Sequence, residues 1–305
     1  QQRAIALSSM KLTDYFLAIL SAFILGVNYV AVKLGVNEFP PLFMVALRFT
    51  IVASVLLWFA KPPRQHFPAV LLFSFTMGTL HFGLIFIGFE NVDASLVAII
   101  FQLGVPMSVI FAWIFLGERF GWRRWLGIAI AFSGAALIAG APQSSSNIFY
   151  LAIVFISILA WAIASVQVKR LANYDAISLS AWMTLLAAPQ LYLASAILES
   201  GQIEALTEAS LAAWGGLFFT AIGASIIGYG LWYHLIGKYS VGRIMPFGFL
   251  APLFGIASAV LFLEERLTLI TIIGAVLILS GVMFVQLRSL PKRSSNDEHD
   301  PAPLT

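Results

Sequence analysis

The chain has 305 residues, of which 60% are hydrophobic and only 10% are charged, and its net charge is +3. An average soluble domain is about 25% charged, and a soluble chain of this length could not bury so much apolar surface. Composition therefore excludes a soluble globular protein. The thinly spread Lys and Arg residues argue against a nucleic-acid-binding face. The absence of cysteine excludes disulfides, cysteine-ligated metals and thiol nucleophiles.

Apolar blocks long enough to cross a bilayer follow one another along the whole chain. A spanning helix needs about 20 mostly apolar residues. On this basis we predict ten spans with short loops, at residues 14–36, 42–59, 68–89, 94–115, 122–140, 148–168, 176–198, 211–233, 241–263 and 269–287. The fold class predicted is thus an all-α membrane protein. The polar, Pro-containing tail at 289–305 is expected to be disordered.

The loop charges give a topology to these spans. If the N-terminal segment 1–11 is cytoplasmic, then of the 17 Lys and Arg residues only Arg266 falls in a segment predicted to lie outside, while Lys33 and Arg48 fall within spans. Cytoplasmic loops of membrane proteins carry an excess of Lys and Arg, and a missed span would destroy this asymmetry. The charges therefore favour ten spans with both termini in the cytoplasm.

An internal repeat relates the two halves of the chain. The segment FLGERFGWRRWLGIAIAFSG recurs as FLEERLTLITIIGAVLILSG at an offset of 147 residues, which pairs Glu118 with Glu265 and Arg119 with Arg266. Five spans per half is an odd number, so the second half is inverted in the membrane relative to the first. Inverted repeats are typical of transporters whose substrate site lies near the midplane between the halves. We predict repeats at 12–140 and 148–288, joined by a periplasmic linker at 141–147.

The twin LGER and LEER segments at 116–119 and 263–266, each followed by an apolar span with a Ser-Gly pair, resemble those of the EamA-like transporters of the drug/metabolite transporter superfamily. The segments LGVNYVAVKLG at 25–35, LRF at 47–49 and the Trp161-Ala162 pair add to the resemblance, which covers residues 12–288. It implies a bacterial inner-membrane exporter of amino acids or related metabolites.

Polar residues inside spans are costly and are candidate substrate contacts. Asn28 offers a donor and an acceptor to a substrate, although an interhelical hydrogen bond would explain it equally well. His81 can bind substrate or exchange a proton near neutral pH; the alternative is a satisfied core histidine. Gln102 is a weaker candidate of the same kind.

Two basic residues fall within spans, and each has two interpretations. The guanidinium of Arg48 would be a bidentate partner for an amino-acid carboxylate. Lys33 offers the same carboxylate a charged partner, but it lies toward the outer end of its span, where extension of its side chain to the lipid headgroups is the favoured interpretation. The same explanation remains open for Arg48.

Several aromatic residues are candidates for the walls of an apolar cavity. At the offset of 147, Tyr229 corresponds to Phe82, the neighbour of His81. Trp161 and Trp182 complete this group. Such a cavity would suit bulky apolar or aromatic amino-acid side chains. Trp232 and Tyr233 fit an interfacial aromatic belt better.

The turn motifs and two prolines are predicted to have structural and mechanical roles. Glu118 with Arg119, and Glu265 with Arg266, each precede a span, where an acidic group fixes a turn and favours the helix dipole. Pro106 and Pro252 lie at nearly equivalent depths of the fourth and ninth spans. We expect them to bend the helices that open each side.

These observations predict a secondary transporter with a small-molecule substrate, a lipid bilayer as its surroundings, and no cofactor, metal or nucleic-acid partner. No protease, hydrolase or phosphate-binding motif is present in the sequence, so no enzyme is expected. A transporter of the same fold for nucleotide sugars or drugs, and a membrane scaffold without cargo, remain as alternatives. The sequence does not predict an oligomeric state.

Overall fold

A computed structural model describes residues 10–63, 67–140, 148–171, 174–239 and 241–287. The expected linker at 141–147, the tail at 289–305 and most of the segment 1–11 lie outside these ranges. Every described element is a helix: α2 (Leu12–Val36), α3 (Pro41–Leu56), η1 (Leu57–Phe59), α4 (Phe67–Phe73), η2 (Ser74–Phe82), α5 (Gly83–Asn91), α6 (Ala94–Phe101), α7 (Gly104–Leu116), α8 (Trp122–Ala139), α9 (Ile148–Arg170), α10 (Ala176–Leu198), α11 (Gln202–Glu208), α12 (Leu211–Phe218), η3 (Phe219–Gly228), α13 (Tyr229–Lys238), α14 (Val241–Gly248), α15 (Leu250–Phe262) and α16 (Leu269–Leu287).

Nine continuous helical stretches within the described ranges are long and apolar enough to cross a bilayer. The remaining predicted span forms α8, which is helical over its expected length but is not among the nine. Its first turn holds Arg123 and Arg124, which leave it less apolar than the others. A helix bundle with nine candidate spans is therefore established, and the tenth stays a prediction.

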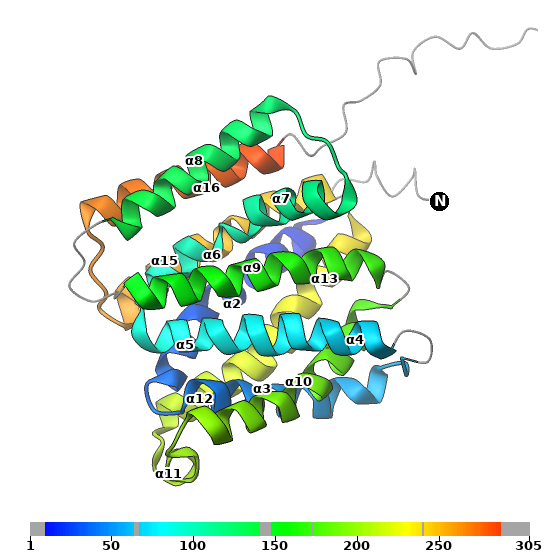
Figure 1. Ribbon diagram of the computed structural model, residues 1–305, viewed down its shortest axis with the longest axis vertical. Helices are drawn as coiled ribbons and strands as arrows, with labels where there is room; N and C mark the ends of the chain where they lie inside the picture. Colours follow the sequence, from blue (N-terminus) through cyan, green and yellow to red (C-terminus); the bar gives the residue numbers. More distant parts are fainter. Residues whose placement is uncertain (1–9, 64–66, 141–147, 172–173, 240, 288–305) are drawn as a thin grey trace, which may run out of the picture.

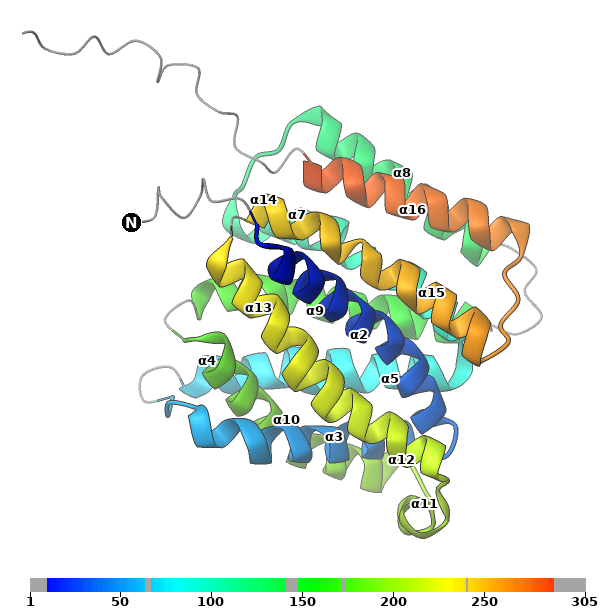
Figure 2. The same cartoon turned by 180° about the vertical axis from the view of Figure 1, so that it is seen from behind.

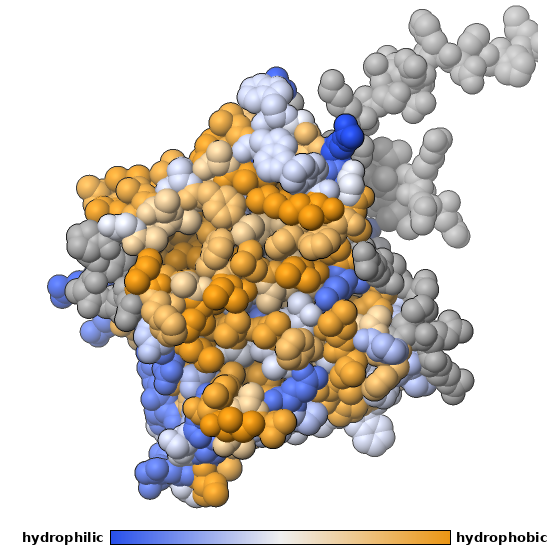
Figure 3. Space-filling model, in the orientation of Figure 1, coloured by the Kyte–Doolittle hydropathy of each residue, from blue (hydrophilic) through white to orange (hydrophobic). Residues whose placement is uncertain are grey.

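The face of the bundle seen in Figure 3 is largely apolar, with scattered hydrophilic side chains, as expected of a surface that contacts lipid. Large side chains such as Trp58, Leu211 and Leu261 are mostly exposed. Inside, one continuous core of buried apolar residues connects the helices of both halves, and Phe39, Phe49, Phe86 and Leu191 are among its largest members.

The helices end on two opposite faces of the molecule. One face carries α11 and the loops at 37–40, 92–93 and 263–268, and the other carries the turn at 117–121 and the start of α2 (Figure 1). We call them the α11 face and the opposite face. On the opposite face, Lys238 donates to the buried carboxylate of Asp14 at 2.9 Å and the Tyr239 hydroxyl donates to it at 2.6 Å, which ties α13 to α2.

The inverted sequence repeat has a counterpart in local geometry. The fourth span is interrupted at Gln102 and Leu103, between α6 and α7, and the ninth is interrupted at Phe249, 147 residues after Gln102, between α14 and α15. The third and eighth spans each contain a π-helical stretch, η2 and η3, at overlapping equivalent positions. Helix irregularities thus recur where the repeat predicts them.

The helices α8 and α16, repeat mates, lie side by side as a separate layer in both views (Figure 1; Figure 2). Glycine makes this close approach possible, because a Cβ placed on Gly134 would lie 2.7 Å from the carbonyl oxygen of Gly274. A Cβ on Gly281 would lie 2.6 Å from the carbonyl oxygen of Gly127. Small residues at a crossing allow membrane helices to approach closely, so this pair joins the two halves along one edge.

Candidate substrate cavity

A cavity of about 290 Å³ lies between the two halves, lined by residues of α2, α3, η2, α5, α6, α7, α9, α13, α14 and α15 and by Gln102 at a helix interruption. Among its lining residues are seven of the eight side chains predicted from the sequence: Asn28, Arg48, His81, Phe82, Gln102, Trp161 and Tyr229. These residues come from spans far apart in the sequence. The fold therefore brings together a set that was predicted one residue at a time.

Arg48 is the only Lys or Arg among the described residues that line the cavity, and it is 3% exposed. Its Nε and Nη2 donate to the hydroxyl of Ser225 at 3.2 and 2.9 Å, and that hydroxyl donates to the carbonyl of Thr220. The guanidinium lies 5.0 Å from the ring centroid of Phe82. Within the described ranges no Asp or Glu forms an ion pair with it. A buried cation without a carboxylate is costly, so this group is suited to a negatively charged ligand.

His81 is buried between the third and sixth spans, and one of its ring nitrogens is engaged. Nδ1 lies 3.0 Å from the carbonyl oxygen and 2.9 Å from the hydroxyl of Ser157, and this hydroxyl also donates to the carbonyl of His81. The ring centroid lies 4.8 Å from that of Phe82 and 5.7 Å from that of Phe101. His81 thus has a hydrogen-bonded partner in α9 and also lines the cavity.

The two amide side chains of the cavity differ in their surroundings. The Oδ1 atom of Asn28 is buried and accepts no hydrogen bond from the described part of the chain. No interhelical hydrogen bond therefore accounts for this carbonyl group. Gln102 lies at the interruption between α6 and α7, where Val105 N–H donates to its backbone carbonyl at 3.2 Å. The break in the helix therefore lies directly at the cavity wall.

Aromatic rings form much of the cavity wall. The ring centroids of Phe101 and Trp161 lie 5.8 Å apart. Trp161 packs closely on Gly104, since a Cβ added to Gly104 would lie 2.9 Å from the Trp161 ring. Tyr29 and Phe89 approach each other at 5.9 Å between ring centroids. The wall is therefore suited to an apolar or aromatic group.

Several residues that line the cavity were not among those predicted from the sequence. Phe86 and Phe89 line the cavity, and with Phe82 they follow a spacing of four and three residues, which places them on one helix face. That spacing could have indicated that Phe86 and Phe89 share the cavity with Phe82. Trp232 also lines the cavity, although an interfacial position was expected for it. Ser225, the partner of Arg48, had no signal in the sequence because only the fold brings η3 to α3.

Trp182 is the one predicted cavity residue that is not among the residues lining it. Its indole N–H donates at 2.8 Å to the backbone carbonyl of Lys61, at the end of the second span. This bond ties α10 to the loop that follows the second span.

Glu265, an acidic residue of the second turn motif, forms hydrogen bonds with the first half of the chain. The carboxylate of Glu265 accepts hydrogen bonds from Ala94 N–H at 2.7 Å and Ser95 N–H at 3.0 Å, and the Ser95 hydroxyl also donates to it. These are the first residues of α6. Glu265 therefore caps a helix of the other half, and the expected capping role extends across the repeat interface.

The backbone of the two turns is nearly the same. Gly117 has φ +67° and its repeat mate Glu264 has φ +56°. Glu118 N–H and Glu265 N–H each donate at 3.4 Å to the carbonyl six residues earlier, of Ala112 and Ala259. Arg119 and Arg266 follow directly after these two positions.

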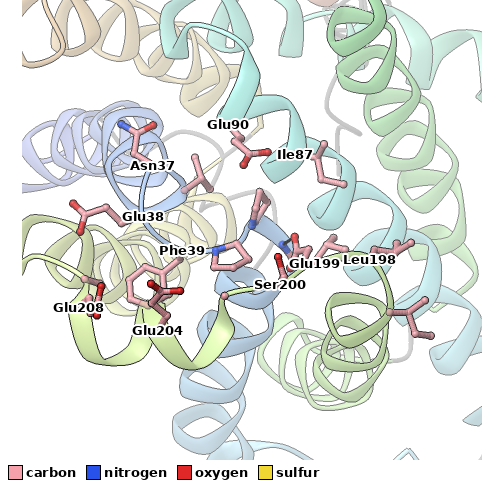
Figure 4. A pocket seen from close by; sticks show the side chains of 18 residues that line it. Asn37, Glu38, Phe39, Ile87, Glu90, Leu198, Glu199, Ser200, Glu204 and Glu208 are labelled. Atoms are coloured by element: carbon pink, nitrogen blue, oxygen red, sulfur yellow. Dashed lines mark hydrogen bonds between the residues drawn. The ribbon is translucent and has the colours of Figure 1, made fainter.

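A second hollow, of about 920 Å³, opens on the α11 face and is lined by five glutamates (Figure 4): Glu38, Glu90, Glu199, Glu204 and Glu208. Two of them are engaged with helix starts. Glu199 accepts from the N–H groups of Leu42 and Phe43, and Glu38 accepts from the hydroxyl and N–H of Ser210. The bonds from Ser210 hold the pKa of Glu38 below its ordinary value. At least these two glutamates of the hollow therefore have capping roles.

Comparison with known proteins agrees with this architecture. A crystal structure with 17% sequence identity superposes with a TM-score of 0.62, covering 92% of this chain and 98% of that chain, which shows a shared fold. An Escherichia coli protein named "probable amino-acid metabolite efflux pump" is 28% identical, with 90% of this chain and 94% of that protein covered.

A more distant relative from Streptantibioticus cattleyicolor is named "probable terminal-alkyne amino-acid exporter" and is 24% identical over 86% of this chain and 90% of its own length. The EamA-like transporter family matches twice, at residues 12–140 and 148–287, which are the two halves of the repeat. The chain therefore belongs to the EamA-like transporter family.

Proposed function

We propose that this protein is a secondary transporter of the bacterial inner membrane that exports amino acids with bulky apolar or aromatic side chains, or closely related metabolites. It crosses the bilayer ten times with both termini in the cytoplasm. The two inverted halves open the central cavity to one side and then to the other, as inverted-repeat transporters do.

The buried guanidinium of Arg48 carries this proposal. It is held by Ser225 and by the ring of Phe82, and it has no carboxylate partner within the described ranges. The carboxylate of an amino acid would compensate its charge through bidentate hydrogen bonds. The aromatic wall would then receive the side chain, and the names of the relatives from Escherichia coli and Streptantibioticus cattleyicolor support amino-acid metabolites as the cargo class.

The cavity also disfavours the other cargo classes. Its volume of about 290 Å³ suits a single small molecule, at the lower end of ligand pockets, and is small for a nucleotide sugar. Within the described residues that line it there is no Asp or Glu, so a cationic drug would meet Arg48 without a compensating acid. An anionic or zwitterionic solute fits this wall best.

The test is uptake of a panel of radiolabelled amino acids into proteoliposomes, with and without a pH gradient. We expect saturable uptake of bulky apolar or aromatic amino acids, and a loss of about tenfold or more in Arg48→Lys, because Lys cannot form the bidentate pair. Arg266→Lys, a conservative change in an exposed turn, serves as the control. If no amino acid is transported, or if Arg48→Lys transports as well as the parent protein, the proposal is wrong.

A further inference from the structure

The turn between α5 and α6, residues 89–95, is held from both sides by charged groups. On the α5 side, the ammonium of Lys33 donates to the carbonyl oxygens of Phe89, Glu90 and Val92 at 2.7, 3.1 and 3.2 Å. On the α6 side, the carboxylate of Glu265 receives the N–H groups described above. A cation thus sits on the negative end of one helix and an anion on the positive end of the next, which is the favourable sense for both helix dipoles.

The two charged groups come from different parts of the molecule. Lys33 belongs to α2 in the first half, and Glu265 belongs to the turn between α15 and α16 in the second half. Hydrogen bonds to an ionised group are stronger than neutral ones. The clamped turn is therefore fastened to both halves at the α11 face, and any movement of α5 and α6 away from α2 and α15 must break these bonds.

The clamped turn lies over one end of the cavity. The carbonyl oxygen of Phe89 accepts the hydrogen bond from Lys33, while the ring of Phe89 lines the cavity beside Tyr29. Val32, next to Lys33, also lines the cavity and is only 1% exposed. Val92 and Ala94, within the turn, are fully or almost fully buried. Phe89 thus belongs both to the clamped turn and to the cavity wall, and Val32 places the wall directly beside Lys33.

We propose that Lys33 and Glu265 are positioning residues that hold the turn 89–95 as the gate of the cavity on the α11 face, and that opening of this face requires both to release it. This inference rests on the proposed transport cycle, since it names what controls one of its two open states. Lys33 therefore does not serve only as a headgroup anchor, and Glu265 does more than fix its own turn.

The absence of cysteine from the chain makes the gate directly measurable. A single reporter, Val32→Cys, is placed in the purified protein in lipid nanodiscs, where both faces are accessible, and its labelling rate by a hydrophilic maleimide is followed. In Glu265→Gln and in Lys33→Gln we expect labelling about tenfold faster than in the reporter protein alone, the effect of losing a charge-assisted interaction. Glu264→Gln is the matched control, because it removes the neighbouring charge without touching the clamp, and its rate should not change.

A second reporter separates gate opening from general loosening. Ile138→Cys lies in the contact between α8 and α16, where Ile138 is fully buried, and its labelling should stay slow in both variants. If Glu265→Gln lowers the yield of folded protein, Lys33→Gln decides, because it leaves the contacts of Glu265 intact. Rates at Val32 within about twofold of Glu264→Gln, or equal acceleration at Ile138, overturn the proposal. Labelling requires no cargo, so a failure of amino-acid uptake would not affect this result.

Discussion

Glu264 adopts a backbone conformation that suits glycine better. It is the one non-glycine residue with positive φ in the described ranges, at +56°, and its repeat mate in the first half is Gly117. A side chain in the left-handed region costs roughly 1–2 kcal/mol. The turn nevertheless keeps its geometry, because the next residue is fixed by its bond to Ala259 and by the cap that it forms on α6. Local strain is thus tolerated where a contact between the halves depends on it.

Glu264→Gly is expected to stabilise the protein by about 0.5 kcal/mol, since relief of strain exceeds the added entropy of the unfolded chain. The reciprocal change, Gly117→Ala, should destabilise it by about 1 kcal/mol, because the same turn then acquires the strain. Thermal unfolding in detergent measures both variants, and the two shifts should have opposite signs. A decrease in thermal stability for Glu264→Gly would contradict this account of the turn.

At the scale of single elements, the interruptions of the fourth and ninth spans lie beside the cavity. Pro106 and Pro252 have no N–H to donate to the carbonyl groups of Gln102 and Gly248, four residues earlier. Both of these acceptor residues line the cavity. The sequence predicted that the two prolines lie at nearly equivalent depths of their spans. The helix breaks at Gln102 and Phe249 were seen only in the structure. A proline alone does not indicate a break, because a continuous helix can tolerate a missing hydrogen bond, as α10 does at Pro189.

We expect Pro106→Ala and Pro252→Ala to change the transport rate about threefold or more while leaving expression nearly unchanged, because a restored N–H allows the helix to close across its break. Pro189→Ala is the control, since α10 continues through that position without a break. Initial rates of uptake into proteoliposomes measure the effect. If both variants transport at the parent rate, these prolines are not hinges.

At the scale of the whole molecule, the two halves are joined at their edge by α8 and α16. The repeat predicts that these helices are equivalent, and the glycines at 127, 134, 274 and 281 occupy matching positions in them. Each of these glycines would place an added Cβ against the other helix. The two equivalent helices of the repeat therefore pack closely on each other. The positions of the spans in the sequence do not indicate this contact.

Gly281→Ala should destabilise the protein by about 1–3 kcal/mol, because the new methyl group meets Ala131 and the carbonyl oxygen of Gly127. Gly215→Ala is the matched control: a Cβ at this helical position meets no other atom within 4 Å, so it should be neutral or slightly stabilising. Thermal unfolding and monodispersity on size exclusion compare the two. Equal behaviour of the variants would show that the α8–α16 contact does not limit stability.

The sequence by itself determined the membrane class, the succession of apolar helices, the duplication and most of the polar residues of the cavity. These follow from rules that act along the chain: the length of an apolar span, the cost of a polar group in lipid and self-similarity at one offset. Only the tertiary structure decided that Ser225 holds Arg48, that the Trp182 indole bonds to Lys61, and that Lys33 and Glu265 both bond to the turn 89–95. Each of these contacts joins residues far apart in sequence, and no local pattern specifies which helices become neighbours.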